Sequence, residues 1–118
     1  MANPNIVNVT TIYGNTATLA VSSTTTNVVS NPTSSGNIYK INLLTVANYS
    51  TNSYAVTAEL NVAGANTNIV KNIVIPANSS LAIIGKDTAM YLLENSSIQL
   101  STTQNSAFHA ICSWEQIS

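Results

Sequence analysis

Side chains that commonly carry catalysis are scarce in this sequence. His109 is the only histidine and Asp87 the only aspartate, so a Ser-His-Asp triad would need both of them and a serine to converge from distant loops. His109 and Cys112 lie three residues apart, which places them on opposite faces of a strand and leaves no tetrahedral metal site. The sequence therefore predicts no enzyme, no catalytic residue, no metal and no cofactor.

The composition is poor in charge. Only 6% of the 118 residues are charged and the formal net charge is -1, which leaves no basic surface for nucleic acid or an anionic membrane. Near-zero net charge favours association, so we expect a subunit of an assembly. The opening MANPNIVNVT lacks the basic and apolar regions of a signal peptide, and no apolar run is long enough for a membrane helix. We therefore expect synthesis in the cytoplasm and no membrane partner.

Alternation of apolar and polar residues predicts antiparallel strands for most of the chain. In SYAVTAELNV, every second residue from Tyr54 to Val62 is apolar or aromatic, the pattern of a half-buried strand. Short strands that recur about every 8 to 12 residues predict an all-β fold, an antiparallel β-sandwich that is jelly-roll-like or Ig-like. The predicted strands of this domain, residues 37–118, are 37–48, 53–62, 68–75, 80–85, 89–93, 97–103 and 107–117.

The first third of the chain has a different pattern. Gly14-Asn15 predicts a hairpin turn within residues 5–21, and residues 22–37 are rich in Ser, Thr and Asn with few apolar side chains. We therefore expect residues 1–36 to form an N-terminal hairpin and extended arm that orders on a neighbouring copy. The alternative is that the hairpin adds edge strands to its own sandwich.

Some predicted strands carry apolar residues on the face turned away from the core. In residues 37–48, alternation places Leu44 and Val46 on the face opposite to that of Tyr39 and Ile41. In the last strand it places Ile111 on the same outer face as His109. Because exposed aliphatic side chains forgo about 1.5 to 3 kcal/mol each relative to burial, these positions are interface candidates. They predict a symmetric homo-oligomer, with a trimer preferred.

Tyr49 differs from the other aromatic residues because it lies in the predicted turn ANYSTNS. A tyrosine ring in a polar loop can stack on the apolar face of a sugar. Tyr49 is therefore the residue most suited to ligand contact. A carbohydrate-binding, receptor-recognition module is one alternative function.

Three stretches resemble a family of small all-β virion structural proteins of tailed bacteriophages. They are IYKINLLTVANYSTNSYAVTAEL, NIVIPANSSLAIIGKDTAMYLLENSSIQL and the closing SWEQIS, and they span about residues 38–118. The resemblance implies a non-enzymatic virion protein whose partners are its own copies and the major capsid protein or other virion proteins. It favours an accessory capsid decoration or cement protein that stabilises the head, with a neck, tail or fibre component as the alternative.

Overall fold

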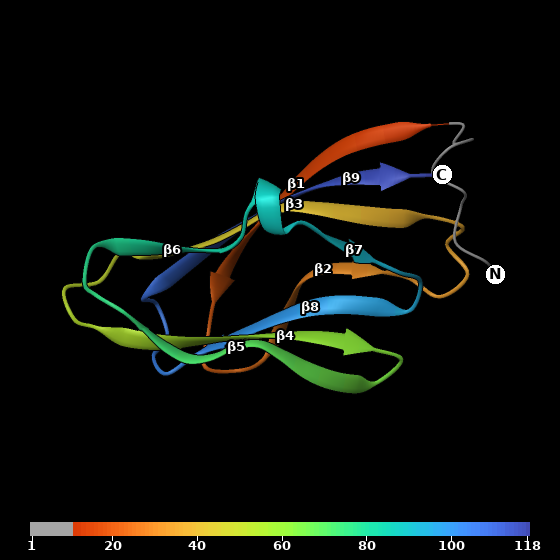
Figure 1. Cartoon of the computed structure of the whole chain (residues 1–118). Helices are drawn as coiled ribbons and strands as arrows, with labels where there is room; N and C mark the ends of the chain where they lie inside the picture. The colour runs from red at the N-terminus through yellow and green to blue at the C-terminus, as the bar shows by residue number, and fades with distance from the viewer. Residues whose placement is uncertain (1–10) are drawn as a thin grey trace.

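Two antiparallel sheets packed face to face form the protein (Figure 1). The computed structural model describes residues 11 to 118, and the predicted all-β sandwich is confirmed. No helix in the described residues is long and apolar enough to cross a membrane. The elements are β1 (Ile12–Val21), β2 (Thr26–Asn31), β3 (Ile38–Asn48), β4 (Tyr54–Val62), β5 (Ala65–Ile75), β6 (Ser79–Ile84), the short 3₁₀ turn η1 (Lys86–Thr88), β7 (Met90–Leu92), β8 (Ser96–Thr102) and β9 (Phe108–Ile117).

The strand order interleaves early and late parts of the chain. One sheet, here called the β9 sheet, runs β1-β9-β3-β6, with β7 also paired to β3; the other, the β8 sheet, runs β2-β8-β4-β5. β6 and β7 both pair with β3 and occupy one position at the end of that sheet. Each sheet then has four strand positions, and their order is that of a jelly roll. Of the two predicted sandwich types, the jelly roll is the one observed.

β9 lies at the centre of its sheet and fills much of the core. It pairs with β1 on one side and with β3 on the other. Its alternate residues Phe108, Ala110 and Cys112 are fully buried, as the period of two in a half-buried strand requires. Tyr39 of β3 stacks on Trp114 with ring centroids 5.8 Å apart, so aromatic packing continues the core along the same strand.

The inward and outward faces of β3 differ from the sequence prediction. Ile41 pairs with Trp114 and Leu43 with Ser113, so Asn42 is an extra residue, a β-bulge that changes which positions face the core. Leu44 and Val46 are fully buried. The prediction that these two residues form an exposed interface is therefore wrong, because strict alternation cannot anticipate the inserted residue.

The described part of the N-terminal third belongs to the sandwich. Residues 12 to 21 form one strand that pairs with β9 along its whole length, and β2 pairs with β8. The predicted hairpin turn at Gly14-Asn15 is absent, because Gly14 lies inside β1 opposite Glu115. Val21, Val28 and Val29 are buried in the common core. The prediction of an arm is therefore wrong for residues 12–31, which add strands to the chain's own sandwich, as the alternative prediction stated. Residues 1–10 lie outside the described residues.

Candidate functional site

The outer edge of β1 is a ten-residue row of backbone groups, and no strand among residues 11 to 118 pairs with it. The N–H groups of Thr11 and Ser118 each donate to the other residue's carbonyl oxygen, at 3.1 and 3.0 Å, which makes this an exchanged pair of an antiparallel ladder. The register continues without a shift to Val21. Because such pairs alternate with pairs whose backbone groups point away, the outward groups belong to Ile12, Gly14, Thr16, Thr18 and Ala20.

Nothing in β1 protects this edge. Proteins usually guard exposed edges with charges, proline, bulges or short strands. The sequence of β1, IYGNTATLAV, has no charged residue and no proline, and its pairing with β9 contains no bulge. Ile12 and Tyr13 are 56% and 59% exposed. β1 is therefore a suitable template for pairing with another strand.

The other edges of the described sheets carry such protection. β6 has six residues and β7 three, and β2 has six residues and a register shift. β5 has eleven residues, but Lys71 and Asn72 together oppose Thr57. Asn72 has a φ of 49° and its N–H donates to Thr57 Oγ1 at 3.0 Å. A second register shift, between Ala58 and Glu59 of β4, leaves Ile69 as another extra residue, so the longest uninterrupted part of β5 is residues 65–68.

β1 and β5 lie on opposite sides of the sandwich. β1 packs beside β2 and β5 beside β6, and each of the two ends its own sheet. Figure 1 shows β1 in red-orange along the upper side and β5 in green along the lower side. The two open edges therefore belong to different sheets and face in different directions.

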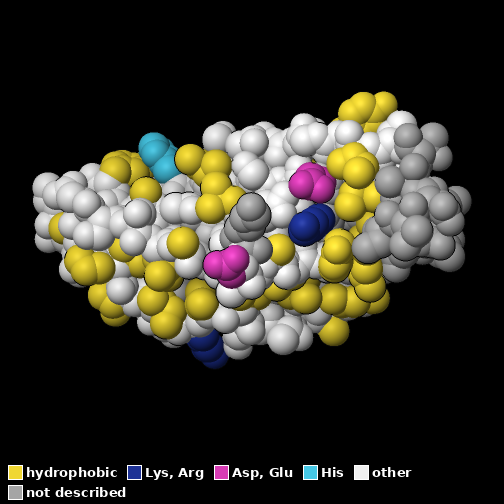
Figure 2. Space-filling model, turned by 45° about the horizontal axis from the view of Figure 1, so that its top comes forward, with side chains coloured by type: hydrophobic (Ala, Val, Ile, Leu, Met, Phe, Trp, Pro, Cys, Tyr) yellow, Lys and Arg dark blue, Asp and Glu magenta, His cyan; other side chains and the backbone are white. Residues whose placement is uncertain are grey.

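A second candidate region lies on the outer face of the β9 sheet. Tyr49, which directly follows β3, packs against His109 with ring centroids 4.3 Å apart and planes 31° apart. Its N–H donates to the carbonyl oxygen of Ala107 at 2.9 Å. We call Tyr49, His109 and Ile111 the Tyr49 surface; all three are exposed. In Figure 2 the one histidine lies apart from the acidic and basic side chains of that face.

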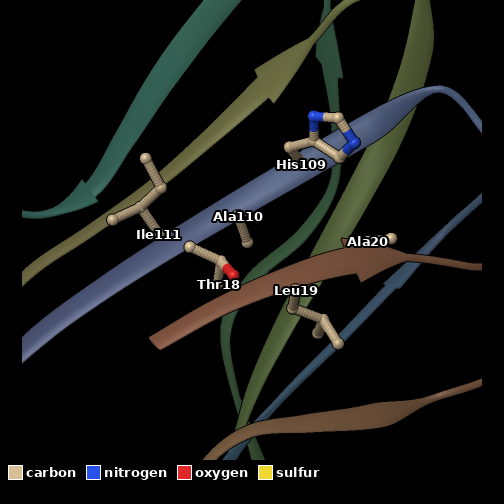
Figure 3. Close-up of a pocket in the computed structure, with 6 residues that line it drawn as sticks. All are labelled: Thr18, Leu19, Ala20, His109, Ala110 and Ile111. Carbon is tan, nitrogen blue, oxygen red and sulfur yellow. The ribbon is translucent and has the colours of Figure 1, made fainter. Parts of the chain in front are cut away.

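Two hollows flank the Tyr49 surface. The first, of about 360 Å³, is formed by three residues of β1 and three of β9. Figure 3 shows Thr18, His109 and Ile111 around it, and Leu19 and Ala110 directed toward the interior. The second, of about 400 Å³, lies between the end of β3 and the start of β6, and it is lined by Ala47, Asn48, Tyr49, Asn78, Ser79 and Ser80.

The sequence found part of this region and missed part. Ile111, His109 and Tyr49 are exposed as expected and lie close together, whereas Leu44 and Val46 are in the core. The contribution of Asn78, Ser79 and Ser80 was missed, since they follow Tyr49 by about thirty residues. The available signal was the turn Pro76-Ala77-Asn78, where Asn78 has a φ of 56° and directly precedes β6, which begins at Ser79.

The side chain of Cys112 does not reach this surface. Its side chain is fully buried, and burial raises the pKa of the thiol to about 12. The reactive form of a cysteine is the thiolate, so Cys112 is inert in the folded chain. Among the described residues, no three His, Cys, Asp or Glu side chains are grouped so that they could hold a metal ion.

Comparison with solved structures shows a likeness in fold to a pilus protein. No protein-family model and no curated protein sequence matches the chain. Among solved structures, it is similar to a chain from Bacillus endospore appendages, which "form a novel family of disulfide-linked pili". The TM-score is 0.55, the sequence identity is 15%, and the match covers 100% of this chain and 96% of that chain. The fold therefore matches that of a structural pilus subunit.

This likeness corrects the resemblance to phage proteins. The predicted virion family, the decoration or cement role on a capsid and the location in a virion are contradicted, because the full-length structural match is to an appendage pilus. A capsid protein as partner has no support. The motifs that suggested the phage family, such as the Pro-Ala-Asn-Ser-Ser turn, are ones that many antiparallel sandwiches use.

Proposed function

We propose that this protein is a non-enzymatic subunit that polymerises with copies of itself into a filamentous appendage. The observation that carries the proposal is the unprotected edge of β1. An added strand of a second copy would satisfy its outward N–H and carbonyl groups, the recognition mode known as β-augmentation. The likeness in fold to a pilus subunit supports the same role.

Growth into a filament needs two different surfaces on each copy. If β1 of one copy paired only with β1 of another, a closed dimer would result, whereas contact between different surfaces on opposite sides repeats without closing. We place the second surface at residues 65–68 of β5, the longest uninterrupted part of the other long edge strand. The low charge of the chain, 6% of residues, limits repulsion between adjacent copies.

The subunits of this polymer join without disulfides. The similar pili are described as disulfide-linked, but the sequence has one cysteine and it is the buried Cys112. Contacts between copies must then come from backbone pairing and side-chain packing.

Proline at position 18 tests the edge. The N–H of Thr18 points away from β9, so Thr18→Pro removes an outward donor and leaves the pairing with β9 intact; proline is tolerated at such edge positions. Thr18→Ala is the matched control, since it changes the same side chain and retains the N–H. We expect wild type and Thr18→Ala to form filaments in electron micrographs, and Thr18→Pro to remain a folded monomer in sedimentation.

Two results would overturn the proposal. One is a wild-type protein that stays monomeric or stops at a discrete trimer at high concentration. The other is a Thr18→Pro variant that is folded and polymerises as the control does, because β1 would then not be the growing edge.

A further inference from the structure

Tyr49 is held in place by the rigid end of a strand. Its N–H is bonded to Ala107, and its ring packs against His109 of β9. Because β3 lies between β9 and β6, the side of the ring turned away from His109 borders the second hollow. An aromatic ring that is both exposed and fixed costs little conformational freedom when a ligand covers it.

The hollow beside this ring carries polar groups free to bind. The side chains of Asn78 and Ser80 are exposed, and neither makes a hydrogen bond to another described residue. Asn48 also lines the hollow, but its amide is already bonded to the carbonyl oxygens of Asn52 and Ile75. One amide and one hydroxyl group therefore face the ring across a hollow of about 400 Å³.

The chemistry of the lining indicates a neutral ligand. None of the six residues that line the hollow is acidic or basic. The remaining combination is a flat aromatic face, an amide and a hydroxyl. A pyranose ring has the matching features, since its C–H groups form an apolar face and its hydroxyl groups donate and accept around the rim.

We propose that the hollow between Tyr49 and Asn78 binds a neutral sugar in its pyranose form. The sugar's apolar face stacks on the Tyr49 ring, and its hydroxyl groups bond to the Asn78 amide and the Ser80 hydroxyl. Ser79 also lines the hollow, and its hydroxyl donates to the carbonyl oxygen of Ala77 at 3.3 Å. This site is separate from the β1 edge, so sugar binding does not depend on polymerisation.

Saturation-transfer NMR on the full chain tests the site. The probes are the methyl pyranosides of glucose, galactose, mannose and N-acetylglucosamine, with N-acetylneuraminic acid as a charged comparison. We expect transfer to the C–H protons of one face of at least one neutral probe. Tyr49→Ala should weaken binding about tenfold or more, the scale of losing one aromatic stacking contact. Asn78→Gly, which accepts the positive φ and removes the amide, should also weaken it.

Tyr91→Ala is the matched control. Tyr91 belongs to the same sheet and is as exposed as Tyr49, 46% in each case, but it is not among the residues that line the hollow. It should bind like wild type, and all variants should unfold at similar temperatures. The inference is overturned if no neutral probe receives saturation, if only N-acetylneuraminic acid does, or if Tyr91→Ala loses as much binding as Tyr49→Ala.

Discussion

Asn31 and Asn48 form equivalent bridges between the two sheets, one before and one at the end of β3. Each side-chain amide donates to one carbonyl oxygen in its own loop and to one at the end of a strand in the other sheet. A serine hydroxyl donates to each amide oxygen, from Ser35 and Ser50 respectively. The accepting carbonyls are those of Asn37 and Leu92, both at 3.0 Å, for Asn31, and those of Asn52 and Ile75, both at 2.9 Å, for Asn48.

Removing either bridge should destabilise the fold strongly. Both asparagines are 1% exposed, so truncation leaves buried carbonyls without donors. We expect Asn31→Ala and Asn48→Ala each to lower the free energy of unfolding by about 2 to 3 kcal/mol, measured by urea denaturation. Asn68→Ala, at an exposed position of β5, should change it by less than about 0.5 kcal/mol. Equal effects at all three positions would contradict the bridging role.

The sequence predicted the strands better than their connections or faces. Periodicity of two identified seven strands from residue 37 onward, because side chains alternate whenever one face is buried. It missed β2, where Val28 and Val29 are adjacent and both buried beside a register shift between Asn27 and Val29. A bulge adds one residue to a strand, and no local pattern distinguishes that residue from its neighbours.

The candidate site was predictable only where a single residue carried the signal. Tyr49 could be identified because it is an aromatic residue in a polar turn. Its neighbours His109 and Asn78 could not be identified, because they are about thirty to sixty residues away in the sequence. They come close to Tyr49 only because β3 pairs with β9 and β6. Protection of an edge is also a property of the sheet order, so the importance of β1 emerges only when its place at the end of the β9 sheet is known.

The bulge at Asn42 predicts that two adjacent leucines contribute unequally to stability. Leu44 is fully buried, and Leu43 is partly exposed on the other face. Leu44→Ala should lower the free energy of unfolding by about 2 to 5 kcal/mol because it leaves a core cavity. Leu43→Ala should cost less than about 1.5 kcal/mol, since a half-exposed side chain has less area to lose. The reverse order in urea denaturation would restore the face assignment made from alternation alone.

Two glycines should respond differently to alanine. Gly64 has a φ of 90° in the tight turn between β4 and β5, so Gly64→Ala should cost about 1 kcal/mol through backbone strain. Gly14 is not among the residues with positive φ, and no atom lies within 4 Å of where its Cβ would stand. Gly14→Ala should therefore be neutral or stabilising by up to about 1 kcal/mol. A loss at Gly14 equal to that at Gly64 would mean that residue 14 is in a turn after all.

The last prediction concerns Cys112 and separates this protein from disulfide-linked pili. With its pKa raised from 9.0 to about 12 by burial, the thiol stays protonated at neutral pH and should not react with a thiol reagent until the chain unfolds. Filaments should therefore form equally well with and without a reducing agent.

The same shift fixes the direction of a pH effect. The unfolded chain releases the thiol proton near pH 9, whereas the folded chain retains it, so the contribution of Cys112 to stability is complete below pH 9 and is lost as pH rises toward 12. Urea denaturation at pH 8 and pH 10 should show a fall in the free energy of unfolding that is smaller in Cys112→Ala. A thiol that reacts rapidly in the native filament, or filaments that dissolve on reduction, would show that Cys112 is accessible and links copies.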